Sequence, residues 1–284
     1  MAIQDYKSAM TQQKFAVVIP RFEGHIHSHA LDEVAETVNY GLRRLGFDSV
    51  LDGYEDQERR QIIIGAHLLG DQLAAAPPGT IIYNLEQTDA PWVPQYAPLF
   101  RDFTLWDYSA RNIEFWAQRD IKAIHVPIGY VSEMTRIQSA KEQDIDVLFY
   151  GFPNERREKV ILELIQRRLN IAVLEGTYGA ERDECIARAK VVLNMHFYEP
   201  GIFEIARVSY LLANKKYVIS ESSIDVPYGL KDAVEFTDYT ELAEFCAIRV
   251  VDNYQRKACA ENGFELFKKF DERDILKKAL EASL

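Results

Sequence analysis

Short unbroken apolar runs alternate with amphipathic stretches along most of the chain. The first run is FAVVIP at residues 15–20, and an amphipathic stretch follows at residues 31–45, closed by Gly46. Runs of this length predict buried strands, and strands alternating with helices predict a parallel sheet covered on both faces. The further apolar runs of this half lie at residues 62–66, 80–86, 103–109 and 121–127.

A second series of the same kind begins after a polar stretch at residues 128–144. Its predicted strands are DVLFYG at 146–151, IAVLEG at 171–176, VVLN at 191–194 and YVIS at 217–220. The restart predicts an α/β chain of two Rossmann-like domains, residues 1–137 and residues 138–284. Ligands of such sheets bind at the carboxyl ends of the strands, so we expect the two domains to face a shared cleft.

Length and charge narrow the classes of function. The chain has 284 residues, of which 48% are hydrophobic, and a formal net charge of −11. That acidity argues against a protein that grips a nucleic-acid backbone. No stretch approaches the roughly 20 apolar residues of a spanning helix, and residues 1–14 lack the apolar core of a signal peptide. Cys185, Cys246 and Cys259 contain no CxxC pair, so we expect reduced thiols in a cytoplasmic protein.

The segment NMHFYEPGIFEIARVSYLLANKK, residues 194–216, places acidic and bulky side chains directly after a predicted strand. We expect its helix to begin near Glu199. A carboxylate accepts two hydrogen bonds at once, which suits the paired hydroxyls of a ribose or a hexose. Alternatively, the acids stabilise the helix dipole, and Glu204 pairs with Arg207. That alternative explains less well the neighbouring His196 and the two aromatic residues after it, so we favour a binding role.

Helix N-termini that follow strands are ready sites for phosphate. The second half predicts three of them, after Gly151, near Gly179 and at Glu199. Arg156 and Arg157 lie in the first turn of one such helix, where basic side chains oppose the dipole. A diphosphate would explain them, and pairing with neighbouring glutamates explains them about equally well. The GxGxxG fingerprint of dinucleotide-binding proteins is absent.

Residues 145–221, from DVLFYG through ERREKVI to ANKKYVISE, resemble the nucleotide-sugar domain of GT-B glycosyltransferases. In particular, they resemble bacterial family-1-type proteins with a similar "NLH-YE-x-x-IFE" loop. The resemblance implies a GT-B fold with a nucleotide sugar as donor and no cofactor. It places Glu199 at the sugar-facing acid and Glu204 near the ribose-facing acid, although the family spacing E-x7-E would put that second acid at Arg207. The donor-binding residues that we expect are Gly151, Arg156, Arg157, Tyr178, Gly179, His196, Tyr198, Glu199, Ile202, Phe203 and Glu204.

In the first half, RFEGHIHSHALDE follows the first predicted strand and sets His25, His27 and His29 at a spacing of two. We expect His27 to remain neutral near pH 7 and to act as a general base on an acceptor hydroxyl. Glu86, just past another predicted strand, is the second catalytic candidate. The H-x-H pattern also suggests a metal site, although the other histidines lack ligand-like spacing. A third interpretation is a polar loop with exposed histidines.

These patterns favour a metal-independent glycosyltransferase whose acceptor is a hydroxyl group of a saccharide, small molecule or protein. Two other hypotheses stay open. One is a nucleotide-sugar-binding protein without catalysis, which the altered acid spacing supports. The other is a metal-dependent hydrolase built on the three clustered histidines.

Overall fold

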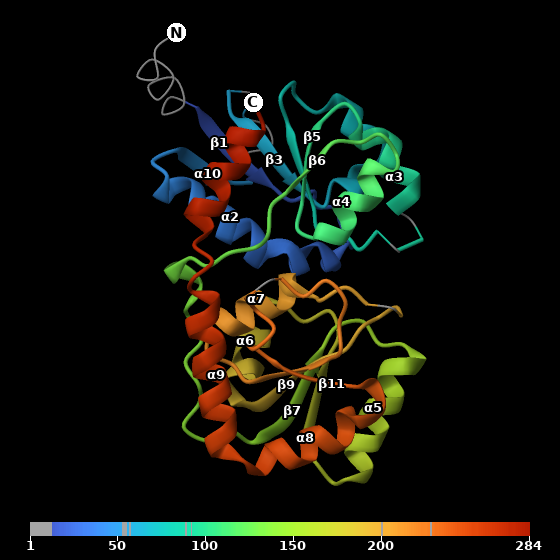
Figure 1. Cartoon of the computed structure of the whole chain (residues 1–284), viewed down its shortest axis with the longest axis vertical. Coiled ribbons are helices and arrows are strands. Elements are labelled where there is room, and N and C mark those ends of the chain that lie inside the picture. The colour runs from blue at the N-terminus through green and yellow to red at the C-terminus, as the bar shows by residue number, and fades with distance from the viewer. Residues whose placement is uncertain are drawn as a thin grey trace. The chain divides into compact units, whose positions relative to one another are not determined.

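The structure is a computed structural model, and it describes residues 13–52, 56, 58–88, 90–91, 93–199, 201–227 and 229–284. The chain divides into two compact units, Met1–Glu133 with Phe270–Leu284, and Met134–Lys269. Each unit contains its own parallel sheet flanked by helices (Figure 1). The predicted α/β class with two parallel sheets is therefore confirmed. Within the described ranges, no helix is long and apolar enough to cross a bilayer.

The first unit is built on a six-stranded parallel sheet in the order β2-β1-β3-β4-β5-β6. Its strands are β1 (Lys14–Val18), β2 (Asp48–Leu51), β3 (Arg60–Ile64), β4 (Ile81–Asn84), β5 (Thr104–Asp107) and β6 (Ala123–His125). Its helices are η1 (Ile26–Leu31), α2 (Asp32–Arg44), η2 (Ala66–Ala75), α3 (Val93–Phe100), α4 (Ala110–Ala117) and α10 (Glu272–Ala282), and the short turn η3 (Ser132–Met134) ends this part of the chain. The expected strands are present: β1, β3, β4 and β5 are apolar runs buried along most of their length, whereas the edge strand β6 is partly exposed.

The sequence predicts a second domain of residues 138–284 whose last helices pack back across the first domain, and the last helix of the chain belongs to the first unit. Helix α10 packs on α2, and a Cβ atom at Gly41 would lie 2.6 Å from Leu276 Cδ1. The buried carboxyl group of Glu272 accepts a 2.6 Å hydrogen bond from the backbone N–H of Gly129. These contacts join residues far apart in the sequence, so no local pattern could indicate them.

The second unit is built on a five-stranded parallel sheet in the order β11-β10-β9-β7-β8. Its strands are β7 (Ile145–Tyr150), β8 (Ile171–Leu174), β9 (Ala189–Asn194), β10 (Val218–Glu221) and β11 (Glu235–Thr237). Its helices are α5 (Glu155–Gln166), α6 (Gly179–Arg188), α7 (Ile205–Ala213), η4 (Tyr239–Glu241), α8 (Leu242–Val251) and α9 (Asn253–Phe267). Alternate side chains of β7, β9 and β10 pack with α5 and α8 in one core. Because these strands are parallel, their carboxyl ends share one edge.

The helix expected near Glu199 begins later, at Ile205. The backbone before it is already paired, since Phe203 N donates to Ile224 O at 3.1 Å and Ile224 N donates to Gly201 O at 3.1 Å. Groups that bond across to another segment cannot also continue a helix, so Glu199 lies in a loop and Glu204 is the N-cap residue of α7.

Candidate functional site

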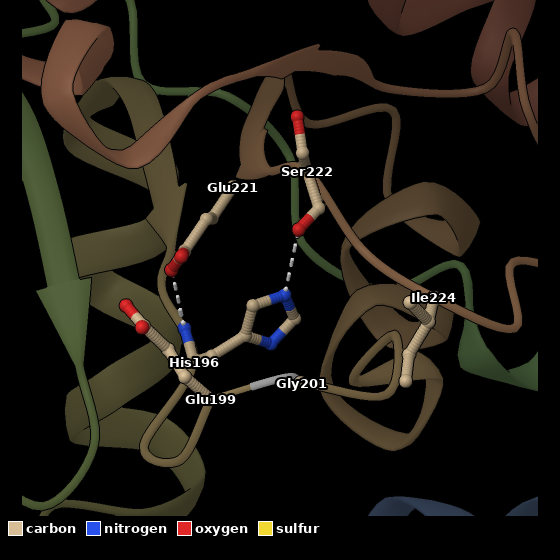
Figure 2. A pocket seen from close by; sticks show the side chains of 6 residues that line it. All are labelled: His196, Glu199, Gly201, Glu221, Ser222 and Ile224. Atoms are coloured by element: carbon tan, nitrogen blue, oxygen red, sulfur yellow. Dashed lines mark hydrogen bonds between the residues drawn. The ribbon is translucent and has the colours of Figure 1, made fainter.

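A pocket of about 490 Å³ lies where β9 and β10 end in the second unit. Figure 2 shows the side chains that line it, which come from the loop after β9 and from the end of β10. The lining residues are His196, Glu199, Gly201, Glu221, Ser222 and Ile224. His196 and Glu199 were expected from the sequence. Glu221 was missed, although an acid directly after the apolar run YVIS could have indicated it.

Arg156, from the first turn of α5, joins two acids of this pocket. Its Nη1 donates to Glu221 Oε2 at 2.7 Å, its Nη2 donates to Glu221 Oε1, and its Nε donates to Glu199 Oε1 at 2.6 Å. Its guanidinium also lies 4.0 Å from the centre of the Tyr239 ring. Burial alone would lower the pKa of Arg156, but the hydrogen bonds to both carboxylates raise it above its usual value. Arg156 is therefore a permanent cation at the pocket.

Arg157 is buried beside it and holds the loop after β9. Its Nη2 donates to Met195 O at 2.6 Å, and its Nη1 donates to Phe152 O at 2.7 Å. The same Nη2 lies 3.3 Å from Glu204 Oε1. Burial lowers the pKa of Arg157 to about 10, so the guanidinium still carries its charge at neutral pH.

Glu204 is shared by two guanidinium groups. Besides Arg157, Arg207 Nη1 lies 2.9 Å from Glu204 Oε2, which is the pairing that the sequence offered as an alternative. Arg207 also approaches the loop after β7, because a Cβ atom at Gly151 would lie 2.9 Å from its Nη2. We call the six charged residues of this edge the arginine–glutamate cluster: Arg156, Arg157, Arg207, Glu199, Glu204 and Glu221.

His196 is 1% exposed and has one ring nitrogen without a partner. Its Nε2 lies 3.3 Å from Ser222 O and 2.9 Å from Ser223 Oγ. A carbonyl oxygen only accepts, and the Ser223 hydroxyl has Glu221 O as its acceptor, so we assign the ring hydrogen to Nε2. In the neutral ring Nδ1 is then an acceptor, and in the described part of the chain nothing donates to it. Gly201 packs so closely on this ring that a Cβ atom there would lie 2.0 Å from His196 Cγ.

The remaining donor-site candidates do not line the pocket. Ile202 and Phe203 are each 1% exposed, and the Phe203 ring packs on Phe236 at 5.5 Å. Their buried side chains thus fix the loop and do not reach a ligand. Tyr178 and Gly179 form the N-terminus of α6. Tyr198 lies in the loop after β9 and packs on Phe197 with ring centres 4.7 Å apart.

In the first unit, the three clustered histidines lie at η1 instead of in an open loop. His27 is exposed, with its ring centre 6.1 Å from that of His25. His29 Nδ1 lies 2.8 Å from Asp32 Oδ2 and 3.0 Å from Arg21 Nη1. Over the described ranges, no group of three or more His, Cys, Asp or Glu side chains is arranged to hold a metal ion.

The histidine that lies beside Glu86 is His67. His67 Nε2 is 3.8 Å from Glu86 Oε1. The two residues follow the neighbouring parallel strands β3 and β4, which end at the same edge of the sheet. Burial lowers the pKa of His67, and nearby His25 lowers it further, while the Glu86 carboxylate opposes the shift. The sequence missed His67 because no regular spacing connects it to Glu86.

No family model matches the chain. Its sequence is 26% identical over 179 residues to the uncharacterised protein L140 of Acanthamoeba polyphaga mimivirus, which covers 58% of this chain and 57% of that protein. It is 29% identical over 147 residues to the uncharacterised protein L138 of the same virus, which covers 48% of this chain and 16% of that protein. The chain thus matches little more than half of the first relative and a small part of the second.

Solved structures match nearly the whole chain. The Anabaena protein HepE in complex with UDP and glucose aligns with a TM-score of 0.61 at 10% identity, over 95% of this chain and 99% of that one. An alpha-glucosyltransferase in complex with UDP and DNA aligns with a TM-score of 0.61 at 8% identity, over 96% and 100%. WaaG, a glycosyltransferase involved in lipopolysaccharide biosynthesis, aligns with a TM-score of 0.57 at 10% identity, over 94% and 99%. The chain therefore has the fold of the GT-B glycosyltransferases.

Proposed function

We propose that this protein is a glycosyltransferase that moves a sugar from a nucleotide-activated donor to an acceptor hydroxyl, and that its second unit binds the donor. The observation that carries the proposal is the arginine–glutamate cluster beside the pocket at the carboxyl edge of the sheet. Ligands of parallel sheets bind at this edge. Structures of the same fold hold UDP, or UDP with glucose, which supports a nucleoside diphosphate as the common ligand.

Different residues of the arginine–glutamate cluster suit different chemical groups of the donor. The N-termini of α5 and α7, with Arg156, Arg157 and Arg207, suit the diphosphate, because guanidinium groups and the positive end of a helix stabilise its charge. These groups can stabilise the leaving diphosphate without a metal ion. Glu204 suits the ribose hydroxyls. Glu199, whose side chain is 64% exposed, suits a sugar hydroxyl.

His196 also offers a hydrogen-bond acceptor to the donor. The lone pair on its Nδ1 is buried and unsatisfied, and such an acceptor costs about 1–3 kcal/mol. A hydroxyl group of the bound donor would satisfy it, provided that the packed Gly201 segment yields slightly. The first unit would then supply the acceptor side, for which His27 and Glu86 are the candidates from sequence. The acceptor, which we take to be a saccharide, small molecule or protein, would meet the enzyme in the cytoplasm.

A second candidate function is donor binding without catalysis. The ion pairs favour it to some extent, because all three cluster arginines already contact carboxylates. A phosphate must compete with those carboxylates for the guanidinium groups. A protein that only senses a nucleotide sugar would tolerate this competition better than an enzyme that must stabilise a leaving group.

Calorimetric titration with UDP, GDP and their common sugar conjugates tests the proposal, with and without EDTA. We expect one nucleotide class to bind, with EDTA making little difference. Slow release of free nucleotide from the bound sugar conjugate would then separate an enzyme from a sensor. If neither nucleotide nor nucleotide sugar binds, the proposed function is wrong.

A further inference from the structure

A fully buried carboxyl group lies at the carboxyl ends of β4 and β5 in the first unit. Asp107 is 0% exposed and accepts hydrogen bonds from Asn84 Nδ2 at 2.7 Å, Trp116 Nε1 at 2.7 Å, Asn112 Nδ2 at 2.9 Å and Ser109 N at 2.9 Å. Burial raises the pKa of Asp107 to about 7, although these donors oppose the shift. Burying an ionisable group is costly, so its presence needs a reason.

The partners of Asp107 hold the short segment around Glu86. Asn84 Nδ2 and Asn112 Nδ2 both donate to Glu86 O, at 3.0 Å and 2.9 Å. Glu86 N donates to Asn84 Oδ1 at 3.3 Å, and the Thr88 hydroxyl donates to Asn112 Oδ1 at 2.9 Å. Both asparagine amides are oriented by Asp107, so one buried carboxyl group fixes the backbone that carries the Glu86 side chain.

The Glu86 side chain faces His67. The 3.8 Å between His67 Nε2 and Glu86 Oε1 is too long for a hydrogen bond between them. An oxygen atom about 2.8 Å from each would fit, which is the ordinary hydrogen-bond length of a hydroxyl group. Both side chains are partly open, at 19% and 26% exposure, so a ligand can reach them. Among the described residues, His25 and the Tyr96 ring, whose centre is 6.2 Å away, also lie near His67.

We propose that His67 and Glu86 bind the acceptor hydroxyl, and that Asp107 is the positioning residue that holds Glu86 opposite His67. This inference rests on the proposed function. In the transfer, the acceptor oxygen bonds to the anomeric carbon, and the bond from that carbon to the diphosphate oxygen breaks. The nucleoside diphosphate leaves with that electron pair. The hydroxyl proton passes to His67, and the Glu86 carboxylate stabilises the resulting imidazolium. His67 thus takes the role that the sequence offered to His27.

The first test needs no substrate. The titration of His67 is followed by NMR through its ring Cε1–H signal, identified by its loss in His67→Asn. We expect a midpoint below the usual value for histidine, because burial disfavours the charged ring. Glu86→Gln should lower the midpoint further by removing the carboxylate that opposes the shift. Asp107→Asn should lower it in the same direction, because the freed segment no longer holds Glu86 at His67. Glu114→Gln, on the exposed face of α4, serves as the matched control and should leave it unchanged.

The second test measures turnover with water as the acceptor, using the nucleotide sugar that binds most tightly in the calorimetric panel. We expect His67→Asn and Glu86→Gln to slow hydrolysis by roughly 10²–10⁴-fold, with donor affinity intact. Asp107→Asn should slow it by about 10-fold or more and shift the acidic limb of the pH profile along with the His67 midpoint. Asp102→Asn, exposed just before β5, is the control.

If Asp107→Asn fails to fold, Thr88→Val replaces it, because this change removes only the hydroxyl bond to Asn112. Wild-type His67 titration and wild-type hydrolysis in the Glu86 and Asp107 variants would overturn the inference. Loss of nucleotide binding in the unaltered protein would instead reject the proposed function, and the NMR titration would still test the position of Glu86.

Discussion

Arg156 donates two parallel hydrogen bonds to Glu221 at the end of β10, and both side chains are largely buried. This pair joins the first turn of α5 to the strand that borders the pocket. Its geometry matches the fork of a guanidinium to the two oxygens of a carboxylate, which lysine cannot reproduce. The pair therefore fixes the pocket wall before any ligand arrives.

A double-mutant cycle of Arg156→Lys and Glu221→Gln measures this coupling by urea unfolding of the second unit. We expect a coupling free energy of about 1–3 kcal/mol, because the pair is mostly shielded from water. The exposed pair Arg188–Asp144, at 40% and 47% exposure, is the internal control. Its coupling should stay below about 1 kcal/mol. Equal coupling in the two cycles would show that burial adds nothing to the Arg156 pair.

Glu204 is the residue that best separates recognition of ribose from recognition of phosphate. Glu204→Gln should weaken UDP binding by roughly 10-fold to 100-fold, the cost of about 1.5–3 kcal/mol for a lost charge-assisted hydrogen bond. It should not weaken the binding of pyrophosphate, because Arg157 and Arg207 lose a competing carboxylate. Calorimetry with both ligands makes the comparison, and Glu261→Gln, exposed on α9, is the control. Equal weakening for both ligands would contradict a ribose role.

The sequence indicated the strands well because parallel strands buried on both faces are continuous apolar runs. It placed the start of α7 too early, since the pairing of Ile202 with Ile224 joins segments that no local pattern connects. The same limit applies to the site. Glu199, Glu204 and His196 stand in one segment and could be found together. Glu221 reaches the pocket only through the neighbouring strand, as His67 reaches Glu86 only through the parallel order of β3 and β4.

Only glycine fits at position 201 without a clash, because a Cβ atom there would overlap the imidazole ring of His196. We expect Gly201→Ala to destabilise the second unit by about 1–3 kcal/mol and to weaken nucleotide-sugar binding by displacing the ring. His196→Ala removes the obstacle, so the double variant should recover most of the stability lost by Gly201→Ala but not the binding. Thermal unfolding and calorimetry of the three variants test both parts. A double variant as unstable as the sum of the single changes would contradict a steric cause.

The buried carboxyl group of Glu272 should make the stability of the first unit depend on pH. Burial raises the pKa of its carboxyl group to about 8 in the folded protein, and Asp271 raises it further, although the hydrogen bond from Gly129 opposes the shift. An acid whose pKa is raised by folding binds its proton more tightly in the folded state. The folded state therefore bears no penalty below the ordinary pKa near 4.5, and a growing one as the pH rises towards 8. Glutamine keeps an oxygen for Gly129 and carries no charge.

We accordingly expect Glu272→Gln to leave stability nearly unchanged at pH 5 and to increase it at pH 8.5 by a few kcal/mol, since each pKa unit corresponds to about 1.4 kcal/mol. Tryptophan fluorescence during urea unfolding reports this unit alone, because Trp92, Trp106 and Trp116 all belong to it. The comparison is made as a difference from the unaltered protein, because the raised pKa of Asp107 adds its own pH dependence to both. Glu281→Gln, exposed on the same helix, should show no such divergence. Parallel pH curves for Glu272→Gln and the unaltered protein would mean that Glu272 carries its charge in the folded state without penalty.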